Sequence, residues 1–261
     1  IALREKYLQR IGAVDTSDEF ATLLQMMVGE LDASHTELSI ASNTTSRNST
    51  PHLGFTIDYS HKGVGIKVKH VPNQTPGSFE KTKIKPGEYI LKIDDRKVSA
   101  DESLYGFLTQ KPTRLTRFTV NSKPSMEDSR EVKYKLLSDS EWRKLRYQEK
   151  VQNLRRRVER STDGSVGYLH LSAMGSSDQA KFEREAYEYI QGKDAMIFDV
   201  RFNNGGNISD TLIDWLERKP HGIYKSRDRE PELAPSRAWN KPIVVLMNEH
   251  SYSNGEMFPY A

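Results

Sequence analysis

The chain has 261 residues, which is enough for one large domain or two ordinary ones with buried cores. Apolar residues make up 36% of it and charged residues 29%, a globular composition on the polar side. The 39 basic and 36 acidic residues leave a formal charge of +3. This balance gives no argument for a nucleic-acid partner or an anionic membrane.

Cysteine is absent, so the chain has no disulfide, thiol nucleophile or thiolate metal site. Its absence suits the cytoplasm and the periplasm alike, and of the two we favour the cytoplasm. No apolar run reaches a membrane-spanning length. The chain opens with Ile1 and shows no signal-peptide pattern, so we interpret it as a fragment or a processed form.

Residues 1–50 are predicted to form a helical N-terminal region that ends in a linker. In "DTSDEFATLLQMMVGEL", Thr16 or Ser17 can cap a helix, acidic residues occupy its first turn, and apolar residues recur at helical spacing. The polar stretch "ASNTTSRNSTP" is a linker by composition.

Residues 51–138 change to short strands separated by turn signals. "GVGIKVKHV" alternates apolar and polar residues, "YILKIDDRKV" runs around an Asp-Asp turn, and "RFTVNS" and "EVKYKLL" follow. This pattern predicts a small β-rich module. Residues 139–165 then form a helical linker whose basic residues interleave with glutamates, which favours a solvated amphipathic helix.

Residues 166–261 follow a β-α-β pattern. "VGYLHLS" and "AMIFDVRF" are predicted strands on either side of an amphipathic helix from Ser177 to Gln191. A helix through "SDTLIDWLERK" and a buried strand in "PIVVLMN" follow. Strands that alternate with helices predict a mostly parallel α/β sheet. The whole chain is therefore predicted to be an α+β multidomain protein.

Two predicted strand ends carry unusual residues, "DVRFNNGG" and "NEHSYSNGE". Ligands and catalytic groups gather beyond the carboxyl ends of strands in such sheets. A serine in a tight strand-to-helix turn can present its hydroxyl outward, and backbone N–H groups there can face an oxyanion. Gly205 and Gly206 can bring a second backbone segment to the same point. Either piece alone is also typical of an ordinary turn or helix cap.

A nucleophilic serine also needs a base. His35, which follows Ser34 where the first helical region ends, is one candidate among the seven histidines. The others are His52, His61, His70, His170, His221 and His250.

Four motifs in this order, "MMVGELDASHTEL", "GYLHLSAMG", "IFDVRFNNGG" and "PIVVLMNEHSYSNGEMFPY", resemble the tricorn-type branch of the tail-specific (C-terminal processing) serine peptidases. The resemblance covers nearly the whole chain and includes an inserted PDZ-like domain through "TPGSFEKTKIKPGEYILKIDDRKV". It implies a crotonase-like α/β peptidase core in residues 166–261. It also implies a serine endopeptidase or C-terminal processing peptidase that acts on peptides or unfolded chains without a metal or organic cofactor.

The resemblance assigns roles to single residues. Ser253 matches the nucleophile, His35 the general base, and Ser34 the serine that helps to set up this base. The backbone N–H groups of Asn254 and of one glycine, Gly206 in preference to Gly205, match the oxyanion hole.

Two departures from the family pattern bear on the site. The family usually has aspartate where this chain has Asn254, a change that keeps the backbone donor. Its remaining catalytic residue, a glutamate, would fall after Ala261. We therefore expect an incomplete core, and an inactive fragment is consistent with that expectation.

The alternative is a catalytically inactive relative that binds peptides or a small apolar ligand. A fluorophosphonate probe would label an active serine and not a binding module. The PDZ-like module is expected either to bind a peptide terminus as an added strand or to act as a spacer. Cleavage preference and oligomeric state, a homo-oligomer included, stay open.

Overall fold

The structure is a computed structural model in which residues 2–33, 35–36, 38, 50–108, 115–235 and 238–261 are described. The chain divides into two compact units, Ile1–Arg47 and Asn48–Ala261. Its mixed α/β structure agrees with the prediction. The finer boundaries at residues 51, 139 and 166 stay predictions, and most of the predicted linker lies outside the described residues.

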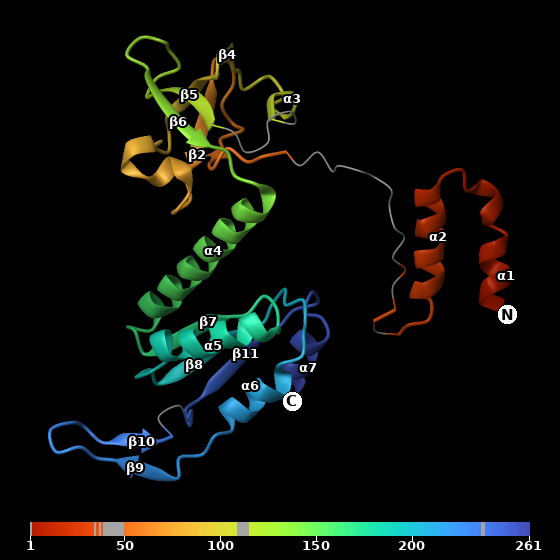
Figure 1. The fold of residues 1–261 in the computed structure, drawn as a ribbon. Helices are drawn as coiled ribbons and strands as arrows, with labels where there is room; N and C mark the ends of the chain where they lie inside the picture. The colour runs from red at the N-terminus through yellow and green to blue at the C-terminus, as the bar shows by residue number, and fades with distance from the viewer. Residues whose placement is uncertain (1, 34, 37, 39–49, 109–114, 236–237) are drawn as a thin grey trace. The chain divides into compact units, whose positions relative to one another are not determined.

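The N-terminal unit contains two helices joined by a short turn (Figure 1). These are α1 (Ala2–Leu8) and α2 (Ser17–Gly29), with the 3-10 turn η1 (Ile11–Ala13) between them. Thr16 caps α2, since its hydroxyl accepts the Glu19 N–H at 3.2 Å and the Glu19 carboxylate accepts the Thr16 N–H at 3.0 Å. Of the two predicted caps, Thr16 is confirmed.

The second unit begins with a β-rich module whose strands pair antiparallel in the order β1-β2-β3-β5-β6, with β4 beside β3. The predicted turn at Asp94 and Asp95 is confirmed, and it joins β3 and β4 as an antiparallel hairpin. The strands are β1 (Thr56–Ile57), β2 (Ile66–His70), β3 (Tyr89–Ile93), β4 (Arg96–Lys97), β5 (Leu115–Asn121) and β6 (Arg130–Lys135). The short helices are η2 (Pro76–Ser78), η3 (Glu80–Thr82) and α3 (Tyr105–Leu108).

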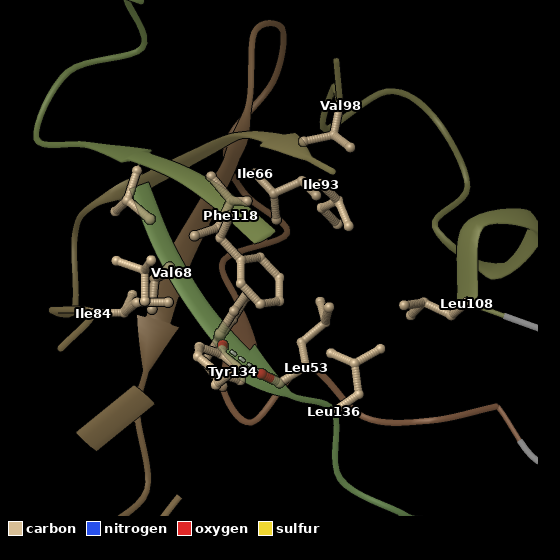
Figure 2. Packing of buried hydrophobic residues seen from close by; sticks show 14 residues of the cluster. Leu53, Ile66, Val68, Ile84, Ile93, Val98, Leu108, Phe118, Tyr134 and Leu136 are labelled. Atoms are coloured by element: carbon tan, nitrogen blue, oxygen red, sulfur yellow. Dashed lines mark hydrogen bonds between the residues drawn. The ribbon is translucent and has the colours of Figure 1, made fainter. Parts of the chain in front are cut away.

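Aliphatic side chains make up most of the core of this module, with an aromatic pair among them (Figure 2). Phe118 of β5 stacks on Tyr134 of β6 with ring centroids 4.7 Å apart. The Tyr134 hydroxyl donates to the Leu53 carbonyl at 2.7 Å, so the one polar atom of the ring has a partner inside the core. The chain segment before β1 is thereby attached to the sheet.

Helix α4 (Asp139–Ser161) follows the module and contacts the elements on both sides of it. Ser138 and Glu141 form a capping box at its start, close to the predicted boundary. Toward the module, the His70 imidazole lies 2.7 Å from the buried Glu149 carboxylate. Toward the last part of the chain, Arg155 donates to the Tyr168 carbonyl of the following sheet at 3.3 Å and pairs with Glu185 of the helix Ser176–Tyr189 at 3.1 Å.

The last part of the chain forms a parallel sheet in the order β11-β8-β7, which confirms the predicted α/β pattern. The strands are β7 (Val166–His170), β8 (Ala195–Asp199) and β11 (Ile243–Leu246). The helices are α5 (Ser176–Tyr189), α6 (Ser209–Leu216) and α7 (Asn254–Tyr260). Phe198 of β8 packs against helices α5 and α7. Its ring stacks on Phe182 of α5 and contacts Phe258 of α7 edge-on, with ring centroids 5.0 Å apart in the second pair.

Two features of this part differ from the prediction. The segment Ile243–Leu246 was expected to be a buried strand, but Val244 is 55% exposed. The reason is that, within the described residues, β11 pairs only with β8 and lies at the sheet edge. An antiparallel hairpin of β9 (Gly222–Tyr224) and β10 (Glu232–Ala234) was not predicted.

No helix in the described ranges is long and apolar enough to cross a membrane.

A buried histidine lies where β7 ends. His170 is 4% exposed, and its Nε2 lies 3.1 Å from the Arg201 carbonyl, which can only accept a hydrogen bond. In the neutral imidazole Nδ1 then accepts from the Tyr147 hydroxyl of α4 at 2.8 Å, and Lys181 donates to the same hydroxyl at 2.8 Å. Burial lowers the pKa of His170, although the Asp199 carboxylate opposes this shift. The imidazole is neutral in this arrangement.

This lowered pKa predicts a loss of stability in mild acid. Unfolded histidines take up a proton as the pH falls through about 6.5, whereas folded His170 stays neutral to a lower pH. The contribution of neutral His170 to the free energy of unfolding is therefore complete above about pH 6.5. It is lost as the pH falls from there toward the pKa of His170 in the folded protein. We expect the difference in Tm between pH 7 and pH 5.5 to be smaller in His170→Gln than in the wild type.

The matched control is His221→Gln, because His221 is exposed. This variant should keep the wild-type dependence of Tm on pH. A His170→Gln variant with the same dependence as the wild type would contradict the assignment.

Candidate active site

Ser253 lies in a strained turn between β11 and α7. Its backbone has φ 54° and ψ −125°, a conformation that residues with a side chain rarely adopt. Its side chain makes no capping hydrogen bond, although it sits at the N-cap position of α7. Within the described residues its hydroxyl has no hydrogen-bond partner. Helix capping therefore does not explain this serine.

Ser251, two residues earlier, has a structural role. Its side chain is buried, and its hydroxyl donates to the Val200 carbonyl at 2.8 Å. It also accepts the Asn248 N–H at 3.2 Å. The bond to Val200 attaches the turn that carries Ser251 and Ser253, here called the serine turn, to the chain that leaves β8, and the bond to Asn248 lies within the serine turn.

The turn after β8 that contains Gly205 and Gly206, here called the glycine turn, lies in contact with the serine turn. Gly205 has φ 77°, and a Cβ placed on it would lie 2.7 Å from Ser253 Cβ and 3.3 Å from Ser253 Oγ. A Cβ on Gly206 would lie 2.0 Å from the Met174 carbonyl oxygen. The two turns that the sequence placed in one site are therefore neighbours, and only glycine fits at either position.

The backbone donors around Ser253 differ in their hydrogen bonds. The Gly205 N–H donates to the Asn203 side-chain oxygen at 2.8 Å. The Gly206 N–H has no acceptor within the described part of the chain. The Asn254 N–H belongs to the first residue of α7, where an intrahelical acceptor is lacking. The Asn254 side chain itself donates to the Ser209 hydroxyl at 2.8 Å.

The predicted base lies in the other unit. His35 is exposed and follows α2 with φ 61°, and Ser34 lies outside the described residues. The pairing of His35 with Ser253, and the roles of Ser34, Asn254, Gly205 and Gly206, stay predictions.

A buried ion pair that the sequence analysis missed supports the glycine turn. Asp199 is 1% exposed and accepts from Arg201 through Oδ1 at 2.9 Å and through Oδ2 at 2.6 Å. The Tyr168 hydroxyl donates to Oδ2 at 2.6 Å. Burial by itself raises the pKa of Asp199, but these hydrogen bonds outweigh it and hold the pKa below its ordinary value. The carboxylate is therefore charged at neutral pH.

One signal in the sequence pointed to these residues. Asp199, Arg201 and Asn203 alternate along "DVRFNNGG", directly after a buried strand. Polar residues in such a place are either exposed or fully bonded, and the pattern does not tell which. Within the described ranges, no group of three or more His, Asp or Glu side chains is placed to hold a metal ion.

Comparison with known proteins adds independent information. Residues 165–261 match peptidase family S41. The chain is 30% identical to a tricorn protease homologue of Streptomyces coelicolor, over 100% of this chain and 23% of that protein. It is 26% identical to the tricorn protease of Thermoplasma acidophilum, over 98% of this chain and 24% of that protein.

A solved structure shows the same fold. The crystal structure of the tricorn protease matches with a TM-score of 0.80 at 24% identity, over 99% of this chain and 25% of that chain. The chain thus spans about a quarter of the length of these relatives. The chain belongs to peptidase family S41, in its tricorn-type branch.

Proposed function

We propose that the chain carries the nucleophile of a serine peptidase that hydrolyses peptides or unfolded protein chains. The observation that carries the proposal is the strained Ser253 turn, whose hydroxyl lies against Gly205 and has no hydrogen-bond partner among the described residues. Backbone strain of this kind costs about 1–3 kcal/mol, persists only where surrounding contacts hold it, and clusters at active sites. Membership of family S41 supports the same chemistry.

The proposed reaction is an acyl transfer. Ser253 Oγ attacks the carbonyl carbon of the substrate while His35 takes its proton, and the resulting tetrahedral intermediate carries a negative oxygen. The carbon–nitrogen bond then breaks, His35 returns the proton to the leaving amine, and an acyl-enzyme remains. Water hydrolyses this ester with His35 again as the base. Ser34 is proposed to help orient His35.

Backbone N–H groups are proposed to bind the negative oxygen. Asn254 supplies one, and Gly206 is favoured over Gly205 for the other because the Gly205 N–H already donates to Asn203. Donors that are held in place before the reaction stabilise such an oxygen without reorganisation. The replacement of the usual aspartate by Asn254 leaves this backbone donor intact.

We further propose that residues 51–138 are a PDZ-like domain that binds peptide ends, and that residues 166–261 are a crotonase-like core. β1 ends the order of the module's sheet, so within the described residues one of its edges has no partner strand. A cavity of about 740 Å³ lies beside it, with walls that include Phe55, Leu104 and Trp142. A free strand edge beside an apolar cavity suits a peptide added as a strand.

The nucleophile and the base can be tested together in the protein at its natural length. Ser253→Ala and His35→Ala should each lower kcat by about 10⁴-fold or more, as loss of a serine or histidine does in other serine peptidases. Fluorophosphonate labelling should disappear in Ser253→Ala. In His35→Ala it should be slow and lose its increase with pH, since only a neutral base accepts the proton.

Ser251→Ala provides the matched control. It removes a buried hydroxyl that donates to Val200, so it should cost about 1 kcal/mol of stability and leave kcat within a few-fold. If Ser253→Ala is still labelled or still hydrolyses peptides at the wild-type rate, Ser253 is not the nucleophile. If the wild type is not labelled, the inactive binding relative is favoured.

A second prediction concerns the contact between the two turns. In Gly205→Ala the new methyl group would meet Ser253 Cβ at 2.7 Å, which forces the serine away from its position. Displacement of a reacting group by about 1 Å can cost 100-fold in rate. We expect kcat/KM to fall by about 100-fold or more.

Gly192→Ala separates this clash from backbone strain. Gly192 has φ 80°, close to the 77° of Gly205, but no atom lies within 4 Å of its Cβ position. Both variants should lose about 1–2 kcal/mol of stability from the positive φ, and only Gly205→Ala should lose activity. Equal activity in the two variants would show that the close contact is unimportant.

The PDZ-like proposal predicts that the module recognises a free carboxyl end. With Ser253→Ala to block hydrolysis, an unstructured peptide should bind at least about tenfold more tightly than its amide, because the amide lacks the charge that backbone N–H groups would hold. Tyr59→Ala should weaken binding, since the exposed Tyr59 ring lines the cavity. Phe79 is also exposed but is not part of the cavity wall, so Phe79→Ala should leave peptide binding unchanged. Equal affinity for both peptides favours the spacer interpretation.

A further inference from the structure

A fully buried asparagine lies between the glycine turn and the serine turn. Asn203 is 0% exposed and follows β8. Its Nδ2 donates to the Leu171 carbonyl at 2.9 Å, and its Oδ1 accepts the Gly205 N–H at 2.8 Å. Because the carbonyl can only accept and the N–H can only donate, the orientation of the amide is determined.

The backbone of Asn203 bonds to the serine turn. Its carbonyl accepts the Tyr252 N–H at 2.9 Å, one residue before Ser253. On the other side of Ser253, a Cβ on Gly255 would lie 2.8 Å from Asn203 Cβ. Asn203 therefore bonds to the residue before Ser253 and lies close to Gly255, two residues after it.

The asparagine also determines which glycine N–H stays free. With Gly205 N–H bound to Asn203, the glycine turn is held on its other side by Met174, whose N–H donates to the Gly205 carbonyl at 2.8 Å. The Met174 carbonyl in turn accepts the Asn207 N–H at 2.8 Å. The peptide groups on both sides of Gly206 are thus restrained, and the Gly206 N–H between them has no acceptor in the described chain.

We propose that Asn203 is a positioning residue for the oxyanion hole. Its side chain holds Gly205 so that the Gly206 N–H is directed away from the protein's own acceptors, and its carbonyl holds that turn against Ser253. This inference rests on the proposed roles of Ser253 and Gly206. Asn203 does not touch the reacting atoms, and its effect is transmitted through Gly205 and Tyr252.

Few side chains can replace Asn203 and keep its two hydrogen bonds. Leucine has a similar size but would leave the buried Gly205 N–H without an acceptor, which is unfavourable. An ionised aspartate would place an oxygen against the Leu171 carbonyl. Serine is shorter, but its hydroxyl can accept an N–H two residues ahead, as asparagine does here. Serine therefore keeps the bond to Gly205 and loses the bond to Leu171.

A pair of small variants tests the bond to Gly205 specifically. Asn203→Ala and Asn203→Ser leave similar cavities and both lose the bond to Leu171, so they differ mainly in the acceptor for Gly205. In the protein at its natural length, Asn203→Ala should lower kcat by about 100-fold with KM within about threefold, as loss of an oxyanion donor does. Asn203→Ser should have a kcat at least tenfold above that of Asn203→Ala.

Two measurements separate this effect from loss of folding. The amplitude of fluorophosphonate labelling gives the fraction of folded enzyme, and kcat is divided by that fraction. The matched control is Asn207→Ala, since the Asn207 side chain is exposed in the same turn. It should retain the wild-type kcat.

The outcomes distinguish this inference from the function on which it rests. Equal corrected kcat in Asn203→Ala and Asn203→Ser, or wild-type kcat in Asn203→Ala, would overturn the role of Asn203 and leave the peptidase assignment intact. If the wild-type protein shows no turnover that depends on Ser253, both the peptidase assignment and the role of Asn203 are wrong.

Discussion

The close approach of the backbone at Gly205 to Ser253 is the constraint on which the rest of the site depends. It follows from strand pairing. β8 and β11 are parallel neighbours in which Leu246 pairs with Asp199, so both strands end at the same edge of the sheet. The turns that leave them meet there, and the space between them has no room for a side chain. Ser253 and the glycine turn are therefore positioned by backbone contacts.

Buried polar groups hold these turns in place from behind. Ser251 and Asn203 each connect the two turns by a hydrogen bond near 2.8 Å or 2.9 Å. Asp199 is a buried charge, which is costly unless it is paired, and Arg201 and Tyr168 satisfy it. His170 then joins the Arg201 carbonyl to Tyr147 of α4, and α4 also contacts the β-rich module through Glu149. A continuous set of contacts therefore runs from the module to the glycine turn.

Sequence periodicity predicted most elements because each has a local cause. The capping residue Thr16, the Asp94-Asp95 hairpin and the long helix α4 depend on neighbouring residues alone. The burial of β11 was predicted wrongly, because four apolar residues in a row look the same at a sheet edge as in its centre. The hairpin of β9 and β10 was missed because its strands have three residues each and lack a clear alternation.

The sequence by itself determined the order of the elements, the parallel sheet and the two turns that carry Ser253 and the glycine pair, since these depend on local patterns and on the strand-end rule. The tertiary structure decided which polar groups are free. Ser251 and Ser253 look alike in the sequence, but of the two hydroxyls only that of Ser251 has a partner in the described part of the chain, a carbonyl 51 residues away. Gly205 and Gly206 also look alike, but the Gly205 N–H donates to Asn203, whereas the Gly206 N–H has no acceptor among the described residues. Such differences depend on which distant groups meet in the fold, and no local pattern contains them.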